Sequence, residues 1–242
     1  MEEFIKKFYD TKYYYNEPTE LCLLMDTYGS DKGPEHLGAN NYTKLYEYVF
    51  KEVKNSTTKL LEFGLGTNYT DTPSSMGPDG KPGSSLRGFR DYFTNAQIYG
   101  ADLDKRVLFS EDRIETFFVD QLSIDSLKDL SNKFDFEFDI IIDDGIHDLA
   151  YRDRKDGISG NIQTLEIFLS KVKKGGYYII EDVAPWQWRH DKTCTVDPAI
   201  LDLVEEIKQG KYGDVSYVAP LNTPRTIDRS HLQETQIILI KK

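Results

Sequence analysis

The stretch IIDDGIHD at residues 141–148 places two carboxylates, a glycine, an imidazole and a third carboxylate directly after an apolar run. A solvated turn is one interpretation of this composition. The other is a reactive site, in which carboxylates bind a cation and the imidazole of His147 accepts a proton. Its context in the rest of the chain is needed to choose between them.

Carboxylates follow other apolar runs in the same way. They stand at Glu62, Asp102, Asp120, Asp143–Asp144 and Glu181–Asp182. In an open α/β sheet, ligands bind in the crevice outside the carboxyl ends of the strands. Like charges gathered at one edge repel one another, so we expect a cation or a set of hydroxyl donors to lie among them.

The pattern of the chain predicts the elements that position these acids. Short apolar runs at 57–64, 96–102, 115–120, 138–143, 175–182, 214–219 and 234–242 are typical of strands, and helical patterns at 85–93, 123–134, 160–172 and 196–209 alternate with most of them. Such alternation predicts an α/β fold with a doubly wound, mostly parallel, seven-stranded Rossmann-like sheet. The last two strands lack an intervening helix, so we expect one reversed strand near an edge. Residues 1–56 are interpreted as an N-terminal helical cap and residues 57–242 as the ligand-binding domain.

A glycine-rich turn, LEFGLGTN, follows the first predicted strand. Gly64 and Gly66 would let a ligand approach the backbone closely. A dinucleotide site usually keeps a third glycine, and Asn68 stands there instead. S-adenosylmethionine suits the acids better, with Glu62 near its amino-acid part, Asp102 on the ribose and Asp120 near the adenine amine. The Gly- and Pro-rich segment 70–85 is interpreted equally well as a surface loop or as a lid over the cofactor.

Five segments together resemble the class I S-adenosylmethionine-dependent methyltransferases. They are LLEFGLGTN, GSSLRGFRDYFTNAQIYGADLD, FFVDQ, IIDDGIHD and KKGGYYIIEDV. More narrowly, the chain is similar to the metal-dependent sugar O-methyltransferases of the mycinamicin and macrocin type. The resemblance covers roughly residues 26–183 and includes GSDKGPEHLG and YTKLYEYVF.

The resemblance implies roles for particular residues. It implies that Asp144, Glu181 and Asp182 hold a magnesium ion and that His147 is the general base. Oxygen ligands without sulfur favour a hard cation, Mg²⁺ first and Mn²⁺ after it. The cofactor contacts that it implies are Glu62, Gly64, Gly66, Asp102, Asp120, Gln121 and Asp143. This chain has Ile146 where the family usually has serine. Adjacent side chains on a strand point to opposite faces, so Glu181 and Asp182 share an ion only if Asp182 lies beyond the regular strand.

Composition narrows the class of partner. With 30 Lys and Arg against 41 Asp and Glu, the net charge of −11 disfavours a nucleic-acid partner. No membrane insertion is expected, the two cysteines fit a reducing cytoplasm, and a homo-oligomer is compatible with the sequence. We expect a small-molecule or glycan-type acceptor, with His36 or Trp186 and Trp188 as candidate contacts. The alternatives are a nicotinamide-dependent oxidoreductase and a non-catalytic cofactor-binding scaffold.

Overall fold

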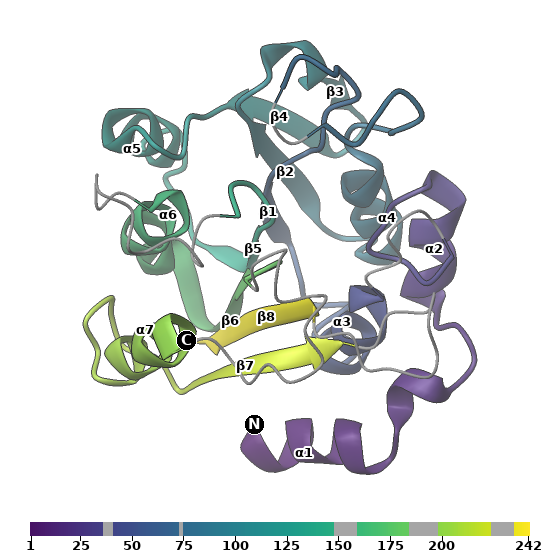
Figure 1. Ribbon diagram of the computed structural model, residues 1–242, viewed down its shortest axis with the longest axis vertical. Helices are drawn as coiled ribbons and strands as arrows, with labels where there is room; N and C mark the ends of the chain where they lie inside the picture. The colour runs from purple at the N-terminus through teal and green to yellow at the C-terminus, as the bar shows by residue number, and fades with distance from the viewer. Residues whose placement is uncertain (36–40, 73–74, 148–158, 184–197, 224–234) are drawn as a thin grey trace.

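A computed structural model of the chain describes residues 1–242 except 36–40, 73–74, 148–158, 184–197 and 224–234. His36, Trp186 and Trp188 lie outside the described residues. The centre of the fold is an eight-stranded sheet with the order β3-β4-β2-β1-β5-β6-β8-β7 (Figure 1). Its strands are β1 (Lys59–Phe63), β2 (Gln97–Asp102), β3 (Ser110–Glu111), β4 (Ile114–Phe118), β5 (Phe138–Asp143), β6 (Val172–Ile180), β7 (Tyr217–Thr223) and β8 (Thr235–Lys241).

Strand directions confirm the mostly parallel α/β prediction. Strands β4, β2, β1, β5 and β6 are paired in parallel. The expected reversed strand is β8, which is antiparallel to both β6 and β7. The predicted number of strands, seven, was one too low, because the two-residue strand β3 pairs antiparallel with β4. Both residues of β3 are exposed, so it leaves no apolar run in the sequence.

Helices cover both faces of the sheet (Figure 1). On one face lie α2 (Glu20–Tyr28), α3 (Tyr42–Phe50) and α4 (Ser84–Tyr92), and on the other lie α5 (Ile124–Ser131), α6 (Gly160–Phe168) and α7 (Pro198–Lys208). Three short 3-10 turns, η1 (Tyr13–Tyr15), η2 (Lys105–Val107) and η4 (Leu169–Lys171), complete the described helical segments.

Strand β5 shows why the predicted strands are continuous apolar runs. Ile140 and Ile142 pack into the cluster beneath α2, α3 and α4, whereas Ile141 packs into the cluster beneath α5, α6 and α7. All three side chains are fully buried. A central strand covered on both faces has no solvent side, so polar alternation is lost until the strand ends at Asp143.

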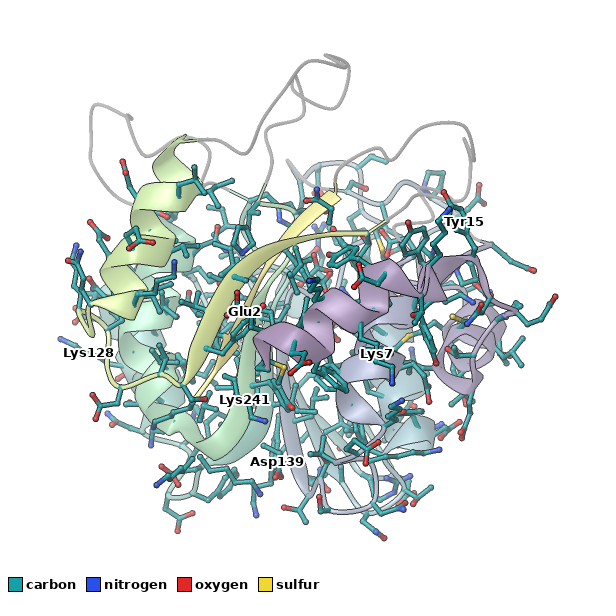
Figure 2. The ribbon with its side chains drawn as sticks, turned by 90° about the horizontal axis from the view of Figure 1, so that it is seen from below. Glu2, Lys7, Tyr15, Lys128, Asp139 and Lys241 are labelled. Carbon is teal, nitrogen blue, oxygen red and sulfur yellow. The ribbon has the colours of Figure 1, made fainter. Side chains whose placement is uncertain are left out.

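The described part of residues 1–56 contains helices and no strand. Its first helix, α1 (Glu2–Asp10), lies beside the β7 side of the sheet in Figure 2. The Tyr9 hydroxyl donates a hydrogen bond of 2.9 Å to the carbonyl oxygen of Asn222 on β7. Ile5 and Phe8 join the same core cluster as residues of β1 and β5. The division at residue 56 into cap and ligand-binding domain stays a prediction. The helices of the described residues include none with the length and hydropathy of a membrane span.

Candidate active site

The strand order places a topological switch point between the neighbouring strands β1 and β5. From β1 the chain crosses to β2 and β4 on one side, and β5 and β6 lie on the other. Such a switch point is where open α/β sheets bind ligands. The pairing sets Glu62 opposite Ile142 and Phe63 opposite Asp143, and Asp143 opposite Ile180. The acids that follow these strands are therefore brought to one edge, as the sequence predicted.

The glycine turn after β1 is shaped by contacts within the protein. Gly64 and Gly66 have φ angles of +84° and +70°, which favour glycine. A Cβ atom at Gly64 would overlap the carbonyl oxygen of Asp144, and one at Gly66 would overlap the side chain of Met76. Contact of either glycine with a cofactor stays a prediction.

Substitution of Gly64 should therefore be far more disruptive than its backbone angle alone implies. Gly175 has the same φ angle of +84° but open space around its Cβ position. We expect Gly175→Ala to lower the free energy of unfolding by about 1 kcal/mol, and Gly64→Ala to lower it by on the order of 3 kcal/mol or more. Denaturant unfolding of both variants measures this difference. Equal losses would show that Asp144 does not press on Gly64.

The segment between the glycine turn and α4 lies against that turn. The Met76 amide donates to the Thr67 carbonyl at 2.8 Å, and the Gly83 amide donates to the Leu65 carbonyl at 2.8 Å. Farther out, the Arg106 guanidinium binds Asp71 at 2.8 and 2.9 Å. These contacts hold the described part of residues 70–85 beside the glycine turn, and whether it acts as a lid stays a prediction.

A buried cluster, formed by the side chains of Glu62, Asp144 and Glu181, surrounds the ammonium of Lys32. Its Nζ lies 2.6 Å from Glu181 Oε2 and 3.3 Å from Glu62 Oε1, and it also bonds to Asp144 Oδ2. The Lys32 side chain is 2% exposed. Burial alone lowers its pKa, but the fields of Asp144, Glu181 and Glu62 together raise the pKa well above the ordinary value. Lys32 is therefore charged. Burial raises the pKa of Glu62 to about 7, although Lys32 opposes that shift.

Two tyrosines of α3 complete the buried cluster around Lys32. The Tyr46 hydroxyl donates to Glu181 Oε1, so both oxygens of Glu181 have a partner. One turn earlier, the Tyr42 hydroxyl donates to Asp182 Oδ1 at 2.7 Å. Residues four apart lie on the same helix face, so α3 presents two phenols to two consecutive acids. Lys32, Tyr42 and Tyr46 were not predicted as site residues from the sequence. The signals that could have found them are the segments GSDKGPEHLG and YTKLYEYVF of the family resemblance and the spacing of four residues between the tyrosines.

A second group of side chains, more exposed to solvent, contains Asp144, His147 and Asp182. One ligand atom from each lies within 4.8 Å of the others. His147 Nε2 is 3.9 Å from Asp144 Oδ1 and 3.9 Å from Asp182 Oδ2. The imidazole is 36% exposed, so an acceptor molecule can reach it. Two of the three predicted metal ligands thus meet the predicted base, while the third, Glu181, faces Lys32 and Tyr46.

The backbone at Asp182 explains how consecutive acids face one region. Strand β6 ends at Ile180, and Asp182 has a left-handed φ of +49°. Beyond the strand the side chains no longer alternate between the two faces of the sheet. Glu181 therefore points into the buried cluster around Lys32, and Asp182 points toward His147. A left-handed non-glycine residue costs about 1 kcal/mol or more, and such residues gather at functional sites. The expectation that Asp182 lies beyond the regular strand is confirmed.

Gln121 and Asp143 form a buried hydrogen-bonded network. Gln121 Nε2 donates to Asp143 Oδ1 at 2.8 Å, and the Ile146 amide donates to Gln121 Oε1 at 2.9 Å. Asn161 Nδ2 donates to Asp143 Oδ2 at 3.0 Å. Burial raises the pKa of Asp143 to about 7 against the effect of the Asn161 and Gln121 hydrogen bonds. The network ties the residue Gln121 after β4 to the turn after β5 at Asp143 and Ile146. Cofactor contacts of Gln121 and Asp143 stay predictions.

Asp102 is the last residue of β2, and Asp120 lies just after β4. Asp102 accepts hydrogen bonds of 2.7 Å from the amides of Leu65 and Asp104. Asp120 accepts one of 2.9 Å from the amide of Leu122. Both side chains are partly exposed, and each carboxylate oxygen has a further lone pair. They can therefore accept hydrogen bonds from a ligand in addition to shaping their own turns.

The donor set fits a hard divalent cation. Asp144 and Asp182 supply carboxylate oxygens that reach the same partly exposed space, and His147 supplies either a further ligand or a base. Glu181, next in sequence to Asp182, is buried and bonds to Lys32 and Tyr46 instead. Carboxylates in such number suit Mg²⁺ or Mn²⁺ better than a metal that prefers sulfur.

Comparisons with known proteins identify relatives of the chain. It is 27% identical over 229 residues to the 8-demethyl-8-alpha-L-rhamnosyl tetracenomycin-C 2'-O-methyltransferase of Streptomyces olivaceus, covering 92% of this chain and 54% of that protein. It is 30% identical over 148 residues to the mycinamicin VI 2''-O-methyltransferase of Micromonospora griseorubida, covering 61% of this chain and 32% of that protein. The chain is a homologue of these O-methyltransferases. This chain spans about half the length of the first of these relatives.

The fold of this chain agrees with the relationship to these O-methyltransferases. The crystal structure of the MycE methyltransferase from the mycinamycin biosynthetic pathway, in complex with Mg and SAH, aligns with a TM-score of 0.63 and 24% sequence identity. The alignment covers 93% of this chain and 55% of the MycE chain. No model of a known protein family matches the sequence. The resemblance to the mycinamicin-type O-methyltransferases and the α/β methyltransferase fold are therefore confirmed.

Proposed function

We propose that this protein transfers a methyl group from S-adenosylmethionine to a hydroxyl of a sugar or glycan-type acceptor, with the assistance of Mg²⁺ or Mn²⁺. The observation that carries the proposal is the meeting of Asp144, His147 and Asp182 at the switch point of the sheet. Its homologues support the choice of reaction, since the S. olivaceus relative is named as a methyltransferase acting on a rhamnosyl group.

The reaction needs alignment and the removal of one proton. The acceptor oxygen attacks the methyl carbon in line with the sulfonium, and the electron pair of the breaking bond stays on sulfur as a neutral thioether. Alignment of the two reactants supplies as much as ~7–11 kcal/mol of such a barrier. The hydroxyl proton passes to His147, whose imidazole is accessible and is flanked by the carboxylates of Asp144 and Asp182.

Those carboxylates stabilise the imidazolium that forms. Asp144, Asp182 and the neighbouring Glu181 would hold the divalent ion, which, when bound, lowers the pKa of the acceptor hydroxyl. Tyr42 keeps the Asp182 carboxylate oriented through its hydrogen bond of 2.7 Å.

The methyl donor would lie along the glycine turn between β1 and β2. In this proposal Glu62 would face its amino group, Asp102 the ribose hydroxyls and Asp120 the adenine amine. Residues 70–85 would cover it, and Met76 already lies over Gly66. Gln121 and Asp143 would support this pocket from below. The proposed partner is a small-molecule or glycan-type acceptor, and the chain, with its net charge of −11, would act in the cytoplasm without a nucleic-acid partner.

Calorimetry and a methyl-transfer assay test this proposal. Binding of S-adenosylmethionine, and no binding of NAD or NADP, separates it from a nicotinamide-dependent oxidoreductase. A panel of free and aglycone-linked sugars, incubated with methyl-labelled donor, should then show incorporation that EDTA abolishes and Mg²⁺ restores. Binding of the nicotinamide cofactors in place of the methyl donor would contradict the proposal.

A further inference from the structure

The position of Lys32 has no part in the reaction described so far. It comes from the connection between α2 and α3, and it reaches acids at the carboxyl ends of three different strands, β1, β5 and β6. In the part of the chain that the structure describes, no arginine or other lysine forms an ion pair with Glu62, Asp144 or Glu181. The ammonium is thus the built-in counter-ion of this acidic edge.

Two of the three partners of Lys32 are proposed ligands of the divalent ion. Asp144 gives its Oδ2 to Lys32, while its Oδ1 faces His147. Glu181 gives Oε2 to Lys32 and Oε1 to Tyr46. A divalent ion on these carboxylates would lie close to a buried ammonium. Charges so close in a poorly solvated region repel strongly, because little water screens them.

We propose that Lys32 is a positioning residue that sets the divalent-cation affinity of the site by electrostatic competition. It holds Glu62, Asp144 and Glu181 together when the ion is absent, and it weakens the binding of the ion when the ion arrives. The inference rests on the proposed metal-assisted function. It predicts that a variant with a neutral side chain of similar length at position 32 binds the ion more tightly than wild type. The same variant should be less stable than wild type when the ion is absent.

The test compares Lys32→Met with wild type and with Lys44→Met. Lys44 is a matched control, because it too is buried, but its ammonium bonds to the neutral carbonyls of Asn16 and Glu17 (2.6 Å to Asn16). Titration with Mn²⁺ in a calorimeter should give a dissociation constant at least tenfold lower for Lys32→Met than for wild type. Lys44→Met should remain within twofold of wild type.

A second readout covers a variant that folds poorly without the ion. Lys32→Gln is also neutral and keeps a donor, and the rise in its melting temperature on adding Mn²⁺ should exceed that of wild type. If wild type binds Mn²⁺ and neither Lys32 variant shows a gain, this inference is wrong while the metal-assisted function stands. If no variant and no wild-type protein binds Mn²⁺, even with S-adenosylhomocysteine present, both fail together. An equal gain in Lys44→Met would also overturn the inference.

Discussion

Replacement of His147 by alanine should lower the rate of methyl transfer by about 10²–10⁴-fold, the usual contribution of a positioned general base. The imidazole is accessible, and the two carboxylates 3.9 Å away can stabilise its protonated form. The loss should appear in kcat, because alanine leaves the acids and the glycine turn in place. Steady-state assays with a sugar acceptor at saturating methyl donor measure it.

The binding of S-adenosylhomocysteine serves as the control for this variant. Its dissociation constant should change by less than about threefold, since no described contact joins His147 to the glycine turn. The same experiment separates an enzyme from a non-catalytic scaffold. A His147→Ala protein that keeps its rate within tenfold of wild type would remove the general base from the account.

Replacement of Asp182 by asparagine should weaken Mn²⁺ binding at least about tenfold, because affinity for hard cations follows the number of charged ligands. Asparagine has nearly the same shape and tolerates a left-handed backbone, so the φ of +49° is no obstacle. The melting temperature should therefore change little. The methyl-transfer rate at fixed, subsaturating Mg²⁺ should fall along with the affinity.

Asp125→Asn is the matched control for the loss of one negative charge. Asp125 is exposed in the first turn of α5, and its replacement should leave Mn²⁺ affinity unchanged. Comparison of the two variants by calorimetry separates a lost ligand from a general change in net charge. An Asp182→Asn protein with wild-type Mn²⁺ affinity would exclude Asp182 from the ion site.

Much of the sheet could be predicted from the sequence because its strands are buried on both faces. The run FDIIID became β5 with the predicted bounds, 138–143. The bounds were less accurate where neighbours decide them. Strand β6 begins at Val172, earlier than predicted, through a register shift opposite Phe138 and Ile140. Strand β7 runs through Pro220, which an edge strand with one partner tolerates.

The acids of the site could be predicted from the sequence, but the lysine among them could not. Carboxylates at the ends of the neighbouring parallel strands β1, β5 and β6 lie close together, because parallel strands end at one edge. Lys32 meets them from 112 and 149 residues away from Asp144 and Glu181, and no local pattern encodes that distance. Asp182 illustrates the intermediate case. The sequence posed the alternation problem, and the turn beyond β6 resolved it.

A crystal structure of the full chain with S-adenosylhomocysteine and Mn²⁺ tests the central claim most directly. The account predicts one anomalous peak bonded to carboxylate oxygens of Asp144 and Asp182, with the cofactor along the turn at Gly64 and Gly66. A peak bonded to neither aspartate, or a cofactor bound away from the β1–β5 crevice, would contradict it.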